Sequence, residues 1–440
     1  MSIYATPKDP IPERLQEIAQ LIRDRNLPAA ARKLNAALKT APSDPRIYLA
    51  GSLLAETAGN PEGARESMAR AAALGGDWPI PVIELALLLA RQNQFEQAMV
   101  QAALALQLAP NNMDVLTRAI DVAHRAQHYA QALDWLLQAQ AITPENLQMK
   151  ALTARDLQLL GRYEESLTAY TELVAALPDE PALRLGRVRA AMALGQRDTA
   201  QQETAALVAN HPLDEQYRFW HEVATGQVPA SLPVSLVQAL FDSSADIYEH
   251  SREQAGDEVP GHVARLILER YPDRTLNVLD LGCGTGLLGA RLGRVQGALI
   301  GVDLASKMVE QAIRHDVYAR FHTVDLRDAL AETPAGLYDV ITACDTFPYV
   351  GDLSKAIPNA SRVLKAGGHL VFSCESASAD EPALALRPAG TLPRYAHQQA
   401  DVEALCRTAG FAEVSAEPIV LRQENNAPVH GFIVVARKAA

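Results

Sequence analysis

Helix-breaking residues recur in the first half of the chain at a constant interval of 34 residues. The breakers are Pro42, Gly76, Pro110, Pro144, Pro178 and Pro212. A second series keeps the same phase, because a small residue stands 12 residues before each breaker. These small residues are Ala30, Ala64, Ala98, Ala132, Ser166 and Ala200. A period between about 20 and 50 residues is typical of a solenoid, so the chain is expected to begin with a stack of similar units.

Each period predicts a hairpin of two helices. Phe95, Tyr129 and Tyr163 lie three residues before the small residue, where the second helix of a hairpin would begin. Small side chains in register let two helices cross closely. Period, small-residue phase and breaker phase together resemble the tetratricopeptide repeat. We therefore expect an all-α superhelix over 11–226, made of about six repeats and a capping helix.

The resemblance implies a concave groove that binds a protein or peptide. An alternative is left open, in which the solenoid only forms a homo-oligomer or shields the second domain. After this region, Gly226 to Pro233 carries two prolines and breaks any helix. We predict a linker over 227–235 and a second domain over 236–440.

A glycine-rich turn follows the first predicted strand of the second domain. The stretch Val278-Leu279-Asp280-Leu281-Gly282-Cys283-Gly284-Thr285-Gly286 reads as a buried strand that enters such a turn and then a helix. Glycine lets the backbone turn sharply and approach a ligand closely. The next strand ends on Asp303, where an acid can accept hydrogen bonds from both ribose hydroxyls of a nucleoside. The pattern predicts a site for an adenosine-type cofactor.

Strands and helices alternate over the rest of the chain, and a β-hairpin closes the series. This order predicts a doubly wound, Rossmann-like domain with a mainly parallel sheet and an antiparallel C-terminal hairpin. Ligands of such sheets lie over the carboxyl ends of the strands. Acidic residues occur at five of these predicted ends, namely Asp280, Asp303, Asp325, Asp345 and Glu375.

The second domain closely resembles class I S-adenosylmethionine-dependent methyltransferases. The resemblance rests on the glycine-rich stretch 278–286, on Gly301-Val302-Asp303-Leu304-Ala305 with Met308, on Val324-Asp325-Leu326, and on Leu364-Lys365-Ala366-Gly367-Gly368. It implies S-adenosylmethionine as the cofactor and methyl transfer as the activity. A tetratricopeptide solenoid before such a domain is similar to bacterial fusions of the two.

The resemblance also implies roles for individual residues. Gly282, Cys283 and Gly284, with Gly286 after them, would pass under the methionine part of the cofactor, and Asp280 would orient its charged end. Asp303 would hold the ribose. Leu304 and Met308 would flank the adenine. The adenine amino group would donate a hydrogen bond to Asp325, which precedes Leu326. We add Asp345 and Tyr248 to the expected cofactor site.

Two other kinds of nucleotide site also have glycine-rich turns. Gly284 to Gly289 also spells GxGxxG, and Asp303 follows at a distance that suits a nicotinamide dinucleotide. The methyl donor is favoured because Asp280 and Gly282 precede that motif and an acid ends the third strand. A P-loop is excluded because no Gly-Lys-Ser/Thr follows the glycines.

The acceptor site is expected among three loops, which contribute Tyr248 and His250, Tyr349, and Arg394-Tyr395-Ala396-His397. His397 is the candidate general base because its ordinary pKa is near neutral, and Tyr395 is a second catalytic candidate. A helix-capping or loop-ordering role for His397 is left open. The exit Cys344-Asp345-Thr346-Phe347-Pro348-Tyr349 differs from the Asn/Asp-Pro-Pro-Tyr of enzymes that methylate amino groups of bases or of glutamine.

Composition limits the classes of partner, metal site and compartment that are expected for this chain. The net charge of −12 argues against a broad nucleic-acid surface, and four scattered cysteines without CxxC spacing argue against a zinc site and for a reducing compartment. No apolar run is long enough to span a bilayer, so we expect a cytoplasmic protein. We also expect no metal site. The leading hypothesis is a methyltransferase whose solenoid recruits a protein or peptide acceptor. The alternatives are a small-molecule methyltransferase with a structural solenoid and a non-catalytic adaptor.

Overall fold

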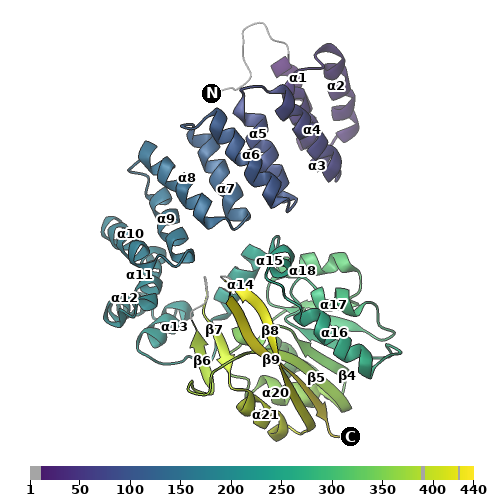
Figure 1. The fold of residues 1–440 in the computed structure, drawn as a ribbon. Coiled ribbons are helices and arrows are strands. Elements are labelled where there is room, and N and C mark those ends of the chain that lie inside the picture. Colours follow the sequence, from purple (N-terminus) through teal and green to yellow (C-terminus); the bar gives the residue numbers. More distant parts are fainter. Residues whose placement is uncertain (1–10, 388–391, 425–426) are drawn as a thin grey trace. The chain divides into compact units, whose positions relative to one another are not determined.

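The computed structural model describes residues 11–387, 392–424 and 427–440. The chain divides into two compact units, one up to Ala190 and one from Ala191 to Ala440. Figure 1 labels their helices and strands.

The repeat region consists of helices in consecutive pairs. They are α1 (Ile11–Arg23), α2 (Leu27–Thr40), α3 (Pro45–Thr57), α4 (Pro61–Leu74), α5 (Pro79–Arg91), α6 (Phe95–Leu108), α7 (Met113–Arg125), α8 (Tyr129–Ile142), α9 (Leu147–Leu159), α10 (Tyr163–Ala176), α11 (Pro181–Ala193) and α12 (Arg197–Asn210). All six predicted breakers lie in the connections that follow the second helix of a pair. The expected helical hairpins are thereby confirmed.

Local chemistry starts many of these helices. The side chains of Asp44, Asn60, Asn112 and Asn146 each accept a hydrogen bond from a backbone amide of the first turn. Such caps satisfy amides that have no partner inside the helix. Proline, whose missing amide costs nothing at the first helical position, begins α3, α4, α5 and α11.

The six small residues in phase are all fully buried. Ser166 differs from the five alanines only by a hydroxyl, which donates to the carbonyl oxygen of Ala154 at 2.8 Å. Because that hydroxyl is satisfied inside the hairpin, serine substitutes for alanine without leaving a buried polar group unpaired. The small side chains therefore lie at helix crossings, as the sequence predicts.

The second unit adds shorter helices to a sheet. The helices after α12 are α13 (Glu215–Ala224), α14 (Val234–Ser244), α15 (Tyr248–Gln254), α16 (Val259–Arg270), α17 (Leu287–Leu292), α18 (Ser306–Ala312), α19 (Leu326–Glu332), α20 (Ala356–Val363) and α21 (Gln399–Thr408). The strands are β1 (Val278–Leu281), β2 (Leu299–Asp303), β3 (Arg320–Thr323), β4 (Tyr338–Ala343), β5 (Leu364–Ser376), β6 (Leu384–Arg387), β7 (Arg394–His397), β8 (Phe411–Glu424) and β9 (Ala427–Lys438).

The described strands form one sheet with the order β3-β2-β1-β4-β5-β7-β6, and β9 pairs with both β5 and β8. Neighbours from β3 to β5 run parallel. The hairpin of β8 and β9 is antiparallel, and β9 adds to β5 in the antiparallel sense. The doubly wound sheet with an antiparallel C-terminal hairpin is as predicted.

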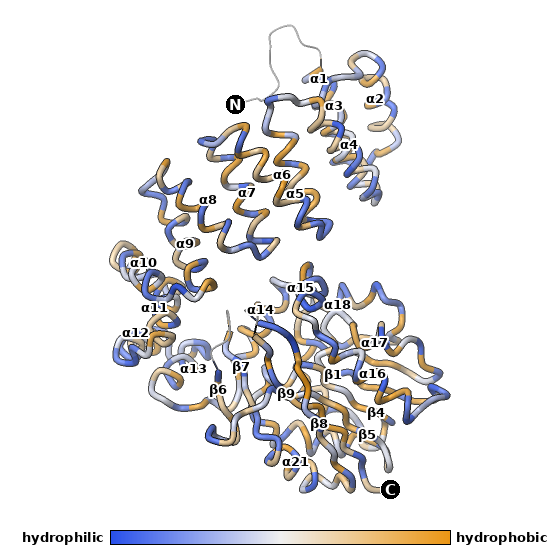
Figure 2. The backbone as a smooth tube through the Cα atoms, in the orientation of Figure 1, coloured by the Kyte–Doolittle hydropathy of each residue, from blue (hydrophilic) through white to orange (hydrophobic). Residues whose placement is uncertain are grey.

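Apolar layers cover both faces of this sheet. Val278, Val340 and Val371 pack against α16 and α17 on one face. Leu279, Ile341 and Leu370 pack against α20 and α21 on the other. Figure 2 shows the central strands as hydrophobic along much of their length, as expected for strands buried on both sides. Because both faces of the sheet are covered, a ligand is expected at the ends of the strands.

The strands β6 and β7 were not predicted. The sequence predicts a loop at Arg394–His397, whereas this segment is β7, which pairs parallel with the end of β5 and antiparallel with β6. All four of its residues are buried. Alternation of apolar and polar residues is expected only of a half-buried strand, so this segment does not show it. Pairing with β5, far away in sequence, decides its conformation.

Before α14 a segment without helix or strand, residues 228–233, forms a strap. The Tyr395 hydroxyl donates to the Pro229 carbonyl at 2.7 Å, and the Asp352 amide donates to the Ala230 carbonyl at 2.8 Å. These bonds fix the strap to β7 and to the loop after β4. Separately, none of the described helices has the length and apolar character needed to cross a membrane.

Candidate functional site

Two adjoining cavities lie at the carboxyl ends of β1, β2 and β4. The empty space of the larger one, which includes part of the open solvent at its mouth, is about 730 Å³, and that of the smaller one is about 390 Å³. Both are lined by Tyr248, Gly282, Gly284, Cys344 and Asp345. These shared residues come from three separate stretches of sequence, and the structure brings them together at the strand ends, where the sequence predicts a ligand.

The glycine loop between β1 and α17 forms the floor shared by the two cavities. Gly282 has φ +65°, and a Cβ there would lie 2.4 Å from Oγ1 of Thr346. Thr346 holds its position by donating to the Leu281 carbonyl at 3.1 Å. Gly286 has φ +86° and lines neither cavity, and a Cβ on it would lie 3.1 Å from the Ala312 side chain. Gly282 therefore shapes the cavity floor, and Gly286 serves the packing of the turn.

Asp303 ends β2 and faces the larger cavity. Its Oδ2 accepts the Gly284 amide at 2.7 Å, and its Oδ1 accepts the Ala305 amide at 2.8 Å. Burial raises the pKa of this carboxyl, and the backbone amides oppose that effect. The acid is thus fixed against the glycine loop, with lone pairs left to accept from a ligand.

Asp280 lies in β1 under the smaller cavity and is almost completely buried. The Tyr318 hydroxyl donates to its Oδ2 at 2.7 Å, and the Thr342 hydroxyl donates to its Oδ1 at 2.8 Å. Burial raises the pKa of Asp280 to about 6, although both hydroxyls oppose the shift. A cation placed in the smaller cavity would favour the ionised carboxylate.

The residues expected to hold an adenine differ in where the structure places them. Leu304, Asp325 and Leu326 line the larger cavity. Asp325 caps α19 by accepting the Arg327 amide at 2.8 Å and pairs with the Arg327 guanidinium at 2.7 Å. Met308 is fully buried and lines neither cavity; it packs with Phe241 and Tyr248, which do line the larger one.

The smaller cavity holds polar groups that suit both ends of an amino acid. Arg252 of α15 lines it beside Asp257, Asp280, Cys283 and Thr285. The Thr285 hydroxyl is buried and has no hydrogen-bond partner among the described residues. A buried hydroxyl without a partner is costly, so a ligand with a polar group at this place would relieve it.

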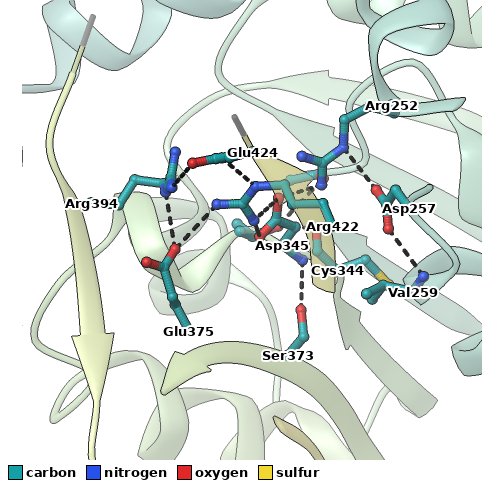
Figure 3. A network of polar contacts seen from close by, with 12 residues as sticks. Arg252, Asp257, Val259, Cys344, Asp345, Ser373, Glu375, Arg394, Arg422 and Glu424 are labelled. Atoms are coloured by element: carbon teal, nitrogen blue, oxygen red, sulfur yellow. Dashed lines mark hydrogen bonds and ion pairs between the residues drawn. The ribbon is translucent and has the colours of Figure 1, made fainter. Parts of the chain in front are cut away.

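Figure 3 shows an ion-pair network, and three of its members, Arg252, Asp257 and Asp345, line the smaller cavity. Asp345 accepts Arg252, and it also accepts Nη1 of Arg422 at 3.0 Å. Burial alone would raise the pKa of Asp345, but the two guanidinium groups hold it below its usual range. Asp345 is therefore an ionised, fully engaged carboxylate, and this makes it a poor proton acceptor.

The two catalytic candidates of the sequence lie away from the cavity walls. Tyr395 is buried and donates to Pro229, and His397 is buried with its Nε2 at 2.8 Å from the Gly351 carbonyl oxygen. Neither residue lines either cavity. Burial lowers the pKa of His397, so its ring is neutral at pH 7 and donates to Gly351 through Nε2. A role as base would have to use Nδ1, and that role stays a prediction.

Sequence reasoning missed several residues of the site. Arg252, Tyr318 and Thr342 contact its carboxylates but belong to no sequence motif. A buried acid in a strand does signal that donors must exist, because an unpaired charge is expensive to bury. The sequence does not say where along the chain those donors are.

Comparisons with known proteins place both halves of the chain. A model described as a methyltransferase domain matches residues 250–416, and tetratricopeptide repeat models match 20–77 and 157–218. The ubiquinone biosynthesis O-methyltransferase of Ralstonia nicotianae is 31% identical over 163 residues, which are 35% of this chain and 68% of that protein. The chain belongs to the S-adenosylmethionine-dependent methyltransferases. It carries tetratricopeptide repeats before the methyltransferase domain.

Other relatives are matched over less of their length. The ubiquinone biosynthesis O-methyltransferase of Paracidovorax citrulli is 31% identical, over 30% of this chain and 61% of that protein. The chain spans between 30% and 68% of the length of the first five curated relatives. Among solved structures, Burkholderia thailandensis 1,6-didemethyltoxoflavin-N1-methyltransferase is 19% identical, covering 49% of this chain and 93% of that one, with a TM-score of 0.37.

The residues of the methyltransferase domain fit S-adenosylmethionine. A Cβ on Gly284 would have only Tyr248 within 4 Å, so the glycine loop has open space there. Asp303 presents a carboxylate to the larger cavity, and the Thr285 hydroxyl lacks a partner among the described residues in the smaller one. The larger cavity suits a nucleoside and the smaller an α-amino acid, which are the two parts of that molecule. Among the described residues, no cluster of three or more histidine, cysteine or acidic side chains could hold a metal ion.

Proposed function

We propose that this protein transfers a methyl group from S-adenosylmethionine to an acceptor that its tetratricopeptide repeats help to recruit. The observation that carries the proposal is the joined pair of cavities at the strand ends, with Asp303 bound to the glycine loop between them. S-adenosylmethionine supplies an electrophilic methyl group on a sulfonium sulfur. The chain then has to bind the donor, orient the acceptor and exclude water.

Each part of the donor has protein groups to meet it. Asp303 accepts hydrogen bonds from the ribose hydroxyls, while Leu304 and Leu326 provide apolar contacts to the adenine. At the amino-acid end, Asp280 attracts the ammonium group, and Arg252 and Thr285 are placed to bind the carboxylate. Tyr248 of α15, which is half-buried and lines both cavities, covers the donor from the N-terminal side.

The acids on the cavity walls do not supply a free base. Asp257, Asp280, Asp303, Asp325 and Asp345 line the cavities, and each accepts at least two hydrogen bonds or ion pairs from protein groups. Acceptors that are already nucleophilic at neutral pH suit such a site best. If a base is required, His397 acting through Nδ1 is the candidate that the sequence offers.

A protein or peptide acceptor is favoured by the repeats, since stacked helical hairpins commonly present a groove to a protein. A small-molecule acceptor is the second candidate, because the relatives at 31% identity are named ubiquinone biosynthesis O-methyltransferases. In that case the repeats would serve assembly into a homo-oligomer. The four cysteines are all free thiols, which suits a protein of the reducing cytoplasm.

The proposal is tested by incubating the full chain and methyl-labelled S-adenosylmethionine with a cell lysate. Asp303→Ala serves as the matched inactive control. Label on one protein band, dependent on Asp303, supports the recruited protein acceptor. Label confined to small molecules supports the second candidate. The absence of Asp303-dependent label from both fractions would count against catalysis and favour a non-catalytic adaptor.

A further inference from the structure

Two arginines of the methyltransferase domain share one carboxylate at the end of the C-terminal hairpin. Glu424, the last residue of β8, accepts Nε of Arg422 on its Oε1 at 2.7 Å and Nη2 of Arg394 on its Oε2 at 2.7 Å. Each carboxylate oxygen thus receives one guanidinium, from β8 and from β7 (Figure 3). Charge-assisted bonds of this kind define a carboxylate position in space.

Glu424 differs from the other acids of the network in its exposure. The side chains of Asp257, Asp345 and Glu375 are only 3–5% exposed, whereas that of Glu424 is 37% exposed. Removing a partner from a buried charge is expensive, so the buried acids cannot easily leave their arginines. Glu424 can turn into solvent at a much lower cost.

The charges of the network also mark Glu424 as the surplus acid. Three arginines (Arg252, Arg394 and Arg422) meet four carboxylates, of which three are buried. The buried acids alone balance the arginines. A carboxylate that replaced Glu424 would keep both guanidinium groups paired and leave the charge of the network unchanged.

The position adjoins the proposed donor site. Arg422 donates to Asp345, which lines both cavities, and to Glu375 at 3.1 Å. Tyr349, on the wall of the larger cavity, lies within electrostatic range of both Arg394 and Arg422. A ligand held by these arginines would therefore be next to the strand ends at which the methyl donor is proposed to bind.

We propose that Arg394 and Arg422 bind a carboxylate of the methyl acceptor, and that Glu424 occupies this position until the acceptor arrives. That the bound carboxylate belongs to the methyl acceptor rests on the proposed function, whereas the existence of the carboxylate site does not. The chemistry is that of an organic acid or of an acidic side chain or terminus of a peptide. Glu424 acts as an internal competitor, which lowers the apparent affinity by the fraction of molecules in which the site is open.

The test measures binding of two probes to the full chain by ligand-observed NMR. The probes are glutarate and the peptide acetyl-Gly-Glu-Gly-amide, each compared with its uncharged counterpart, glutaramide or the Gln peptide. The variants are Glu424→Gln and Arg394→Gln. Glu413→Gln is the matched control, because Glu413 also pairs with an arginine of the same hairpin, Arg437, at 2.8 Å, but both are exposed.

If Glu424 holds the site nine-tenths of the time, Glu424→Gln raises the affinity for an acidic probe about tenfold. Arg394→Gln lowers it below that of the wild type, and Glu413→Gln leaves it unchanged. Preference for glutarate identifies a small-acid site, and preference for the peptide identifies an acidic side chain; either supports the proposal.

Equal affinities in the wild type and Glu424→Gln, or equal binding of charged and uncharged probes, would overturn it. The Glu424→Gln comparison does not depend on how well Arg394→Gln folds. Binding of S-adenosylmethionine is measured in the same samples. Failure of the donor to bind rejects the proposed function, while the response of the acidic probes to Glu424→Gln still decides whether the carboxylate site exists.

Discussion

The Asp303 carboxylate accepts the Gly284 amide at 2.7 Å and so ties the end of β2 to the glycine loop that follows β1. The second oxygen accepts the Ala305 amide at the start of the next helical segment. Both bonds are made by protein groups alone, and together they orient the acid against the loop. Such preorganisation reduces the ordering cost of binding.

Replacement of Gly282 by alanine should destabilise the protein by more than backbone strain alone would. Gly282 and Gly336 have nearly the same φ, +65° and +66°, but a Cβ on Gly336 would meet nothing within 4 Å. Gly336→Ala should cost about 1 kcal/mol of stability from left-handed strain. Gly282→Ala should cost about 2–4 kcal/mol, because its Cβ also clashes with Thr346. Thermal unfolding of both variants checks this, and equal losses would contradict the proposed close packing.

Binding of S-adenosylmethionine should depend on pH through Asp280. Its pKa of about 6 in the folded protein means that the acid is largely protonated at pH 5 and ionised at pH 7. An ammonium group beside it favours the ionised form, so affinity should rise with pH across about 5 to 7 and then level off. Calorimetric titrations across this range measure the slope. In Asp280→Asn that rise should be absent, and an identical rise in the variant would assign it to another group.

The same carboxyl should affect stability in the opposite direction. Its folded pKa lies above the ordinary 3.8, so its contribution is fully present below about pH 4 and is lost as pH rises through about 6. The free energy of unfolding of the wild type, minus that of Asp280→Asn, should therefore fall by up to about 3 kcal/mol over this range. Unfolding at several pH values measures the difference. A difference that rises with pH would mean that Asp280 is stabilised as an anion.

The strap should contribute to donor binding through Tyr395. Tyr395→Phe removes the bond to the Pro229 carbonyl, and the following residues Leu232 and Val234 line the larger cavity. Loss of one such bond should cost about 1 kcal/mol and weaken S-adenosylmethionine binding several-fold. Tyr48→Phe, which removes a similar tyrosine bond to Pro42 in the repeats, is the control and should leave that affinity unchanged. Equal affinities for S-adenosylmethionine in Tyr395→Phe and Tyr48→Phe would mean that the strap does not contribute to donor binding.

The repeat geometry should tolerate Ser166→Ala and reject Ser166→Leu. Ser166 is fully buried at a helix crossing where the other five repeats have alanine. Alanine loses only the bond to Ala154, worth about 1 kcal/mol, whereas leucine overfills the crossing and should cost about 1–3 kcal/mol or more. Circular dichroism during thermal unfolding compares the two. Similar unfolding temperatures would mean that the crossing is less tightly packed than the structure has it.

Local patterns predicted much of this fold. The spacing of Pro110 from Pro144 and the position of Ala132 between them predicted the hairpin of α7 and α8, because breakers and close crossings depend on near neighbours in sequence. The same holds for β1, the glycine loop and β2, where strand, turn and acid follow one another directly. Asp303 was placed on the cavity wall as its position predicted.

The rest depends on contacts between distant segments. Strand β7 exists because it pairs with the end of β5, and nothing in Arg394–His397 alone distinguishes it from a loop. Arg252 and Tyr318 reach their carboxylates across 93 and 38 residues of sequence. Met308 shares the predicted motif but faces the core instead of the cavity, because the motif cannot specify which side of a short helix is turned inward.

The most direct test of the account is the equilibrium binding of S-adenosylmethionine to the full chain and to Asp303→Asn. Asparagine keeps the size of the side chain but weakens acceptance from the ribose hydroxyls. Asp316→Asn is the control, since Asp316 forms an exposed ion pair with Arg294. We predict saturable binding that falls about tenfold or more in Asp303→Asn and is unchanged in Asp316→Asn. No binding to the wild type, or equal binding by all three proteins, would contradict the assignment of this site to the methyl donor.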